Sequence, residues 1–557
     1  MDRRRMKLTV IIAACLLCFG LGAFVQQQSL QSPITRDIVA SAEKLMGLQF
    51  SEAKRDSMLD GLKDQLDNYE NIRKVHLPNS TPPAVLFNPI PVGMKFQNER
   101  KPFRMSPPGT VDLPANPDNL AFYSVGQLAE LIRTRRITSE ALTRLYIGRL
   151  KKYGPKLECV ITLTEDLALR QARKADEEIA EGKYRGPLHG IPYGAKDLLA
   201  VRGYKTTWGA MPFKDQIFDE DATVIKRLEE AGAVLVAKLS MGALAWGDVW
   251  YGGKTKNPWN YKEGSSGSSA GPASATAAGL VAFSIGTETW GSIVSPSTRC
   301  GDTGLRPTYG RVSRYGAMAL SWSMDKIGPI CRTVEDCAIV LNAICGPDGK
   351  DQTLYDVPFN YDPDIKLHDV RIGFLKTEFD SVKGDHTSND AALAKLRELG
   401  ATLIPIELPK YPMNDLSIIL SAEAGAAFDD LTRSGKDDLL VRQGKDAWPN
   451  VFRLSRFIPA VEYIQANRIR YDVIQDMAKL MDDIDVYVAP PFEGDNLLLT
   501  NLTGHPQVVL PDGFSKEGTP TSITFVGRLF GEATLLAVAK KYQDATDFYL
   551  KHPMLQE

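Results

Sequence analysis

The sequence predicts one large α/β domain, in which helices cover a mixed central sheet, preceded by an N-terminal helical and extended segment. Short apolar runs of strand length alternate with amphipathic helical stretches, which is the pattern of such a sheet. The chain has 557 residues, of which 43% are hydrophobic and 24% are charged, a balance typical of folded globular proteins. Its formal net charge of −2 provides no overall basic field, so nucleic acid is not a predicted partner.

Residues 1–25 are predicted to be a signal peptide or a membrane anchor. Four basic residues lie among the first seven, and residues 8–25 contain no charge. A basic start followed by an apolar run is typical of an export signal, so we expect cleavage near residues 23–26. A retained membrane anchor through residues 8–25 is the second alternative, and lipidation at Cys15 is the third. The predicted location is therefore exported: periplasmic, secreted or membrane-anchored.

Residues 26–118 are predicted to form an N-terminal extension. Residues 33–75 have a helical pattern of apolar positions, with Ile38, Ala42 and Leu45 on one stripe. Residues 76–118 are rich in proline, which favours an extended connector lying over the surface. We expect this extension to pack across the main domain near the mouth of a pocket.

Residues 119–550 are predicted to form the main domain. Its first expected helix begins after Ser124. A second helix is expected from Thr138, with Gly154 as its stop. The later elements expected from periodicity are a helix at 223–231, strands at 233–239 and 281–285, a strand–helix–strand unit at 370–410, helices over 415–484, a strand at 486–489 and a closing segment at 501–545.

Residues 264–296 (GSSGSSAGPASATAAGLVAFSIGTETWGSIVSP) are the segment most indicative of chemistry. The first part taken alone resembles a flexible linker. However, it continues directly into small residues suited to a buried helix and then into an apolar strand, which ends in a second glycine turn. Glycines let backbone N–H groups approach a ligand, and a hydroxyl on such a turn is a candidate nucleophile. Two serine-bearing turns joined by one buried helix therefore suggest a catalytic centre.

A serine nucleophile needs a base, and none of the six histidines lies in a recognisable triad context. Residues 267–271 match G-x-S-x-G formally, but the loop-like residues before them argue against a nucleophile elbow. A lysine serves as a base when burial lowers its pKa. Lys196, at the end of the strand-like run GPLHGIPYGAK, is the candidate base.

These segments resemble the amidase signature family. The resemblance is carried by GPLHGIPYGAKD around Lys196, the serine loop, GTETWGS, then GLRPTYGRV at 304–312, and by NLTGHP and FVGR near the C-terminus. It covers about residues 120–545. It implies a Ser-cisSer-Lys triad that cleaves amides, with Ser292 as the nucleophile, Ser268 as the cis serine and Lys196 as the base. Ser268 lies 24 residues before Ser292, which is the family's interval.

The resemblance also implies how the triad would work. Lys196 would take a proton through Ser268 while Ser292 attacks the carbonyl carbon, and an acyl-enzyme would then be hydrolysed. Backbone N–H groups around residues 289–292 would stabilise the oxyanion. The oxyanion and substrate-binding residues implied are Thr289, Trp290, Gly291 and Ser269.

The chain departs from the family pattern at three positions of the nucleophile turn. Glu288, Trp290 and Val294 stand where the family often has aspartate, glycine and arginine. Trp290 is expected to wall the pocket, with packing as the alternative. Without the arginine, a substrate carboxylate loses an obvious partner, which counts against the glutamine-hydrolysing subunit of a tRNA amidotransferase. His189 is expected to be structural.

The predicted function is that of an exported amidohydrolase acting on a small-molecule or peptide amide. An esterase or carbamate hydrolase of the same fold is one alternative, and a non-catalytic binding protein that retains the fold is another. No metal or organic cofactor is predicted, because the sequence holds no P-loop, G-x-G-x-x-G or H-E-x-x-H pattern and its cysteine spacing matches no zinc site. Membrane attachment, a homodimer and the identities of the acyl and amine groups remain open.

Overall fold

A computed structural model describes residues 34–382 and 387–556. The predicted signal peptide or membrane anchor at residues 1–25 lies outside this part of the chain. Among the residues that the structure describes, no helix has the length and apolar character needed to cross a membrane. The chain divides into two compact units, one ending at Pro78 and the other running from Asn79 onward.

The smaller unit contains two helices where the periodicity predicts one helical stretch. These are α2 (Arg36–Met46) and α3 (Glu52–Arg73). The side chain of Thr35 accepts the Ile38 N–H and so caps the start of α2. Gly47 ends α2 in the left-handed conformation, at φ 68°, which glycine adopts without steric cost. The helical prediction is therefore confirmed, with a break at Gly47.

The larger unit is built on an 11-stranded sheet of mixed direction, with strand order β1-β3-β2-β8-β10-β9-β14-β15-β13-β11-β12. Two small hairpins, β4–β5 and β6–β7, lie outside it. The strands are β1 (Val160–Leu163), β2 (Pro192–Lys196), β3 (Val234–Leu239), β4 (Val249–Trp250), β5 (Gly253–Lys254), β6 (Lys256–Asn257), β7 (Asn260–Gly264), β8 (Phe283–Glu288), β9 (Thr303–Arg306), β10 (Lys326–Cys331), β11 (Ile372–Leu375), β12 (Leu403–Ile406), β13 (Val486–Ala489), β14 (Gln507–Phe514) and β15 (Pro520–Gly527).

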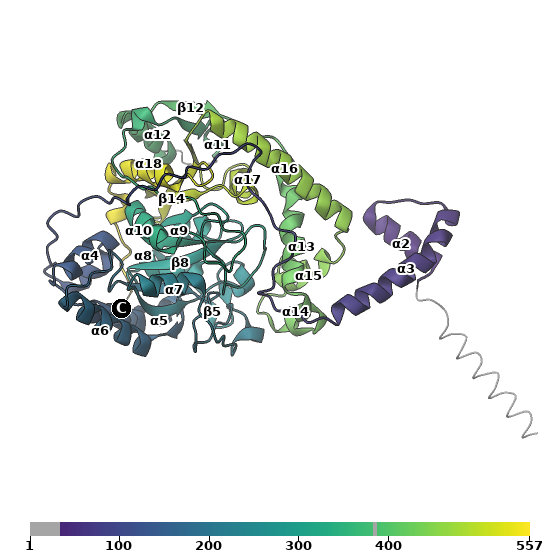
Figure 1. The fold of residues 1–557 in the computed structure, drawn as a ribbon, viewed down its shortest axis with the longest axis horizontal. Helices are drawn as coiled ribbons and strands as arrows, with labels where there is room; N and C mark the ends of the chain where they lie inside the picture. The colour runs from purple at the N-terminus through teal and green to yellow at the C-terminus, as the bar shows by residue number, and fades with distance from the viewer. Residues whose placement is uncertain (1–33, 383–386, 557) are drawn as a thin grey trace, which may run out of the picture. The chain divides into compact units, whose positions relative to one another are not determined.

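Helices surround this sheet, as the α/β prediction requires (Figure 1). They are α4 (Val125–Arg133), α5 (Ser139–Leu157), α6 (Glu165–Ala180), α7 (Thr223–Glu230), α8 (Ala270–Ala277), α9 (Val294–Cys300), α10 (Val334–Ile344), α11 (Lys376–Ser381), α12 (Thr387–Glu398), α13 (Ile418–Ala427), α14 (Asp429–Arg433), α15 (Trp448–Ser455), α16 (Ala460–Asp482), α17 (Asn496–Thr503) and α18 (Glu532–Asp544). Helices α13, α15 and α16 form a group beside the sheet (Figure 1).

The middle strands of the sheet position the candidate site. Strand β2 runs parallel to both β3 and β8, while β10 pairs with β8 in the antiparallel sense. The carboxyl ends of β2 and β8 therefore meet at one edge of the sheet. Lys196 is the last residue of β2, and the serine turn at 289–292 follows β8 directly. Loops at the carboxyl ends of parallel strands are a common place for a binding site.

Two boundary predictions were wrong. Helix α5 continues past Gly154 to Leu157, and Glu158 then adopts a left-handed conformation. Gly154 is instead a close contact, since a Cβ there would lie 3.1 Å from the Val160 side chain. Strand β8 begins and ends later than the predicted 281–285. It continues to Glu288 because its pairing with β10 extends to Lys326.

The predicted connector belongs to the larger unit from residue 79 onward. It contains no helix or strand over residues 79–116, as its prolines predict. It is nevertheless fixed to the main body, because the Arg104 N–H donates to Tyr361 O and the Ser106 N–H donates to the Glu335 carboxylate. The boundary between the two compact units thus lies between residues 78 and 79, not at residue 118.

Candidate active site

Lys196 is completely buried at the carboxyl end of β2. Its Nζ donates to Ser268 Oγ at 2.8 Å and to Thr287 Oγ1 at 2.8 Å. Burial lowers the pKa of Lys196 to about 7, against the opposing pull of the Asp325 and Glu288 carboxylates. No ion pair holds this lysine among the described residues. A substantial neutral fraction near pH 7 makes it chemically able to accept a proton.

The loop that leads into α8 brings two serines to Lys196. The peptide bond between Gly267 and Ser268 is cis. Ser268 is the residue that the resemblance implies to be the cis serine. Ser269 Oγ accepts a hydrogen bond from Lys196 Nζ at 3.1 Å and donates to Thr287 O at 3.0 Å. It also accepts the Thr287 N–H at 3.1 Å. Ser269 therefore helps to hold Lys196, and its expected role in substrate binding stays a prediction.

Ser292 lies on the turn that follows β8. Its backbone oxygen accepts the Ser269 N–H at 3.1 Å, so the two serine turns are joined directly. The residue is 7% exposed, and its hydroxyl makes no hydrogen bond within the described part of the chain. The same holds for the backbone N–H groups of Trp290, Gly291 and Ser292. Unpaired N–H groups beside a free hydroxyl are what an oxyanion site requires.

Glu288 fixes the base of this turn. Its Oε2 accepts the N–H groups of Ile293 and Val294 at 2.8 and 3.0 Å. Its Oε1 accepts from Arg306 Nη1 at 2.7 Å and from Asn501 Nδ2 at 2.8 Å. Burial would raise the pKa of Glu288, but the Arg306 charge and these hydrogen bonds lower it to about 2. Glu288 is thus a fully buried carboxylate that ties the turn to β9 and α17.

The role of Glu288 was missed in the sequence, where it was noted only as a departure from the family pattern. The useful signal was a lone acidic residue at the end of an apolar strand. Such a residue needs a buried cation or several N–H donors to remain charged. The matching partners, Arg306 and Asn501, lie in the two later segments that carry the resemblance, GLRPTYGRV and NLTGHP.

Thr289 Oγ1 donates to Asp325 Oδ1 at 2.6 Å, and Asp325 also accepts the N–H groups of Leu320 and Ser321. Thr289 is therefore held toward the loop before β10. Trp290, by contrast, is 40% exposed and does not line the main cavity of the described chain. The cavity is lined by Thr287 and Thr289, and the expectation that Trp290 walls the substrate pocket stays a prediction.

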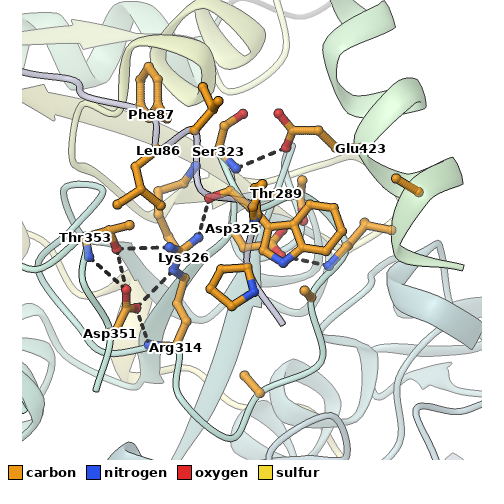
Figure 2. Close-up of a pocket in the computed structure, with 18 of the residues that line it drawn as sticks. Leu86, Phe87, Thr289, Arg314, Ser323, Asp325, Lys326, Asp351, Thr353 and Glu423 are labelled. Carbon is orange, nitrogen blue, oxygen red and sulfur yellow. Dashed lines mark hydrogen bonds and ion pairs between the residues drawn. The ribbon is translucent and has the colours of Figure 1, made fainter. Parts of the chain in front are cut away.

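A cavity of about 1130 Å³ opens beside Thr287 and Thr289. Figure 2 shows Thr289, Asp325 and Lys326 among its lining residues, together with Leu86 and Phe87 from the connector. Its volume slightly exceeds the usual range, about 300–1,000 Å³, of sites that hold drug-sized ligands. Besides a polar end, its walls carry many apolar side chains, among them Leu198, Met318, Trp322, Ile327, Ile464 and Ile474.

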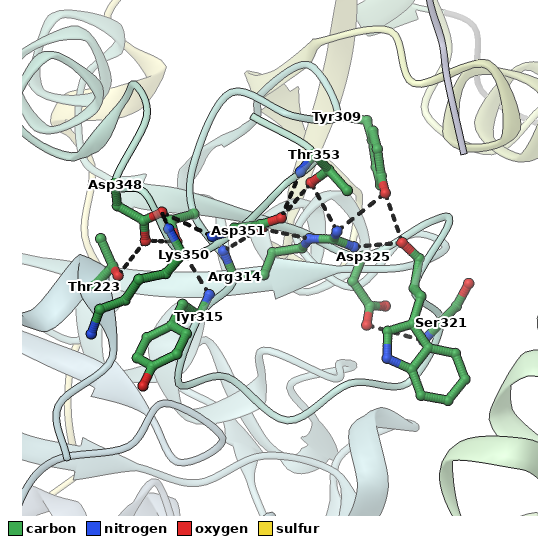
Figure 3. Close-up of polar contacts among 12 residues, drawn as sticks. Thr223, Tyr309, Arg314, Tyr315, Ser321, Asp325, Asp348, Lys350, Asp351 and Thr353 are labelled. Carbon is green, nitrogen blue, oxygen red and sulfur yellow. Dashed lines mark hydrogen bonds and ion pairs between the residues drawn. The ribbon is translucent and has the colours of Figure 1, made fainter. Parts of the chain in front are cut away.

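Arg314 supports one wall of this cavity through a network of polar contacts (Figure 3). Its Nε donates to Asp351 Oδ2 at 3.2 Å, and its Nη1 donates to Trp322 O at 2.6 Å. Its Nη2 donates to the hydroxyls of Tyr309 and Thr353 at 3.1 and 2.9 Å. These bonds engage four of the five N–H groups of the guanidinium, so Arg314 is held in place as part of the cavity wall.

Comparison with known proteins identifies the family. The profile of the family described as Amidase matches residues 141–536. A glutamyl-tRNA(Gln) amidotransferase subunit from Methylococcus capsulatus is 34% identical over 481 residues, which cover 77% of this chain and 98% of that protein. The chain belongs to the amidase family. Like its relatives, it is an amidase-type enzyme that acts on carbon–nitrogen bonds.

Solved structures of the family share the fold of this amidase. The native peptide amidase of Stenotrophomonas maltophilia superposes with a TM-score of 0.71 at 29% sequence identity, covering 79% of this chain and all of that one (100%). A glutamyl-tRNA(Gln) amidotransferase subunit from Thermotoga maritima has a TM-score of 0.67 at 24% identity, covering 81% and 100% of the two chains. The predicted fold and family are therefore confirmed.

The remaining site predictions concern histidines and metals. In this amidase, His189 is buried, and its Nε2 lies 3.2 Å from the Glu178 carboxylate. Its Nδ1 accepts the Arg185 N–H at 3.2 Å, a structural arrangement. Among the described residues, no group of three or more His, Cys, Asp or Glu side chains is placed to hold a metal ion.

Proposed function

We propose that this amidase hydrolyses a carboxylic amide to an acid and an amine or ammonia through an acyl-enzyme on Ser292. The observation that carries the proposal is the buried Lys196, whose Nζ lies 2.8 Å from Ser268 Oγ. A pKa of about 7 suits a group that must take and return a proton near neutral pH.

The proposed reaction needs only groups of this chain and water. Lys196 accepts the Ser268 hydroxyl proton as Ser268 accepts that of Ser292, and Ser292 Oγ bonds to the amide carbon. The N–H groups of Trp290, Gly291 and Ser292 stabilise the resulting oxyanion. Return of the proton along the same path to the nitrogen breaks the C–N bond and releases the amine. A water molecule then adds to the acyl ester, loses its proton to the relay and regenerates Ser292 as the acid leaves.

We further propose that the substrate is an amide whose large, partly apolar acyl group fills the cavity. Support comes from the cavity's size and apolar lining, and from the similarity to the peptide amidase. The position of Val294, where the family often has arginine, argues against a free carboxylate beside the reacting carbon. This also counts against a role as the glutamine-hydrolysing component of a larger complex, although most of the chain resembles proteins of that kind.

The test uses purified residues 26–557, Ser292→Ala and Lys196→Ala with a panel of amides, anilides and esters. We expect acid and amine to be released by the wild-type protein, with a loss of at least 10³-fold in both variants. Turnover that survives Ser292→Ala would show that the nucleophile is wrong. Hydrolysis restricted to esters would favour the esterase alternative. Complete inactivity, with no labelling of Ser292 by an activated phosphonate, would favour a binding protein.

We also propose that the protein is exported, on the basis of the basic start and the uncharged residues 8–25. The measurement is N-terminal sequencing of the mature protein after cell fractionation. A mature start near residues 23–26 in the exported fraction is expected. A start at Met1 in a membrane fraction would support the anchor, a lipid on Cys15 would support lipidation, and full-length protein in the cytoplasm would contradict export.

A further inference from the structure

We propose that residues 79–88, here called the strap, are a specificity element that walls the acyl pocket and favours amides with long apolar acyl groups. The inference rests on the proposed function, which places the acyl group of the substrate in this cavity. The strap contributes eight lining residues to the cavity that opens beside Thr289: Asn79, Ser80, Pro82, Pro83, Val85, Leu86, Phe87 and Asn88.

The strap is anchored at its first residue. Asn79 Nδ2 donates to Ala319 O at 2.9 Å and to Ala427 O at 3.3 Å. Asn79 Oδ1 accepts the Ala319 N–H at 2.8 Å. One side chain therefore ties the strap to the loop before β10 and to the end of α13. Three hydrogen bonds to backbone groups far away in sequence hold Asn79 in one position.

The strap is anchored again at its far end. The Arg470 guanidinium stacks on the Phe87 ring at 3.5 Å from the centroid, and Tyr309 contacts the same ring edge-on at 5.0 Å. Asn88 Oδ1 accepts the Tyr355 hydroxyl at 2.9 Å. Arg470 is itself buried and bonded to Leu502 O and Ser323. The end of the strap at Phe87 therefore contacts Arg470, which itself lines the cavity.

The span between the anchors presents apolar atoms to the cavity. Pro82 and Pro83 fix their backbone φ angles and so limit how far the span can move. Leu86 is 39% exposed and lines the cavity. Figure 2 shows it near Phe87. An apolar side chain held partly exposed on a pocket wall gains burial when an apolar ligand group covers it.

The strap lies outside the part of the chain that the amidase profile matches. The amidase profile matches residues 141–536, so this wall comes from a segment outside the matched region. Thr287 at the end of β8 and Thr289 in the turn after it come from the matched region, whereas the strap contributes other lining residues of the same cavity. We infer that the strap sets acyl selectivity without taking part in the chemical step.

The experiment compares Leu86→Ala with Val92→Ala across straight-chain amides from acetamide to octanamide. Val92 is a matched control, because it is an apolar residue of the same connector, 79% exposed and outside the cavity lining. We expect Leu86→Ala to lower kcat/KM for octanamide by about tenfold while changing it for acetamide by less than about twofold. Val92→Ala should leave both unchanged. A uniform change along the series, or no change, overturns the proposal.

A binding measurement separates failure of the strap from failure of the proposed function. Octanamide is titrated by calorimetry into Ser292→Ala and into the Ser292→Ala, Leu86→Ala double variant, each checked for unchanged thermal melting. We expect about tenfold weaker binding to the double variant. Equal affinities, or no binding to either, overturn the strap proposal. Hydrolysis that persists in Ser292→Ala overturns the proposed nucleophile, and the affinity comparison still decides the role of the strap.

Discussion

At the scale of single residues, the site depends on a lysine that burial keeps close to neutral. Because the pKa of Lys196 is lowered to about 7, the fraction able to accept a proton falls as the pH falls below that value. We expect kcat/KM to rise about tenfold per pH unit below pH 7 and to level off above it. Initial rates over pH 5–9, with melting checked at each pH, measure this. A profile that declines through pH 7 as the pH rises would contradict the assignment of Lys196 as the base.

Glu288 provides a second prediction at this scale. Glu288→Gln leaves the buried Arg306 without its counter-charge and places an amide donor against groups that already donate. We expect the free energy of unfolding to fall by about 3–5 kcal/mol and kcat to fall with it. Urea denaturation measures the first effect. Glu263→Gln, which breaks the exposed Glu263–Arg299 pair, is the matched control and should change little. Equal stability of the two variants would contradict the role given to Glu288.

At the scale of elements, α8 shows why small residues join the two serine turns. Every residue of α8 is buried, and a Cβ on Gly271 would lie 2.5 Å from Ser240 N and 2.6 Å from Cys159 O. Both are backbone atoms, so neither can move aside easily. We expect Gly271→Ala to destabilise the protein by about 1–3 kcal/mol and to lower activity through displacement of Ser268 and Ser269.

The control for this element is Gly148→Ala in α5, another helical glycine, which has no atom within 4 Å of the added methyl group. It should be neutral or stabilising by up to about 1 kcal/mol, because alanine has the higher helix propensity. Thermal unfolding of both variants is the measurement. If Gly271→Ala is tolerated as well as Gly148→Ala, the close packing of α8 does not matter.

At the scale of the whole molecule, the two compact units predict the result of truncation. Residues up to Pro78 form one unit, and the strap begins at Asn79 in the other. We expect deletion of residues 1–78 to leave the melting temperature and kcat/KM of the larger unit unchanged. Deletion of residues 1–118 should instead destabilise it, since the connector's bonds to Tyr361 and Glu335 are lost. Calorimetry and kinetics on both truncations measure this, and equal behaviour of the two would contradict it.

The sequence was most informative where chemistry is local. Lys196, Ser268 and Ser292 carry recognisable neighbours, and the structure brings Lys196 and Ser268 into hydrogen-bond distance. Apolar patterns also predicted many of the helices, but among the strands only β2, β3, β8, β11, β12 and β13. What could not be predicted depends on distant contacts: Asn501 reaching Glu288, Thr289 turning toward Asp325, and proline-rich residues closing a cavity. Periodicity contains no information on which residues meet across several hundred positions.

The Glu288–Arg306–Asn501 cluster has a consequence for partial chains. All three proposed catalytic residues lie before residue 300, but the turn that carries Ser292 is held by a side chain at residue 501. A polypeptide cut after α16 would keep the entire predicted triad and lack that hold. We therefore expect the turn to be held fully only in a chain that includes residue 501. We expect a nascent or proteolysed chain that ends before residue 501 to be inert, although Lys196, Ser268 and Ser292 are all present.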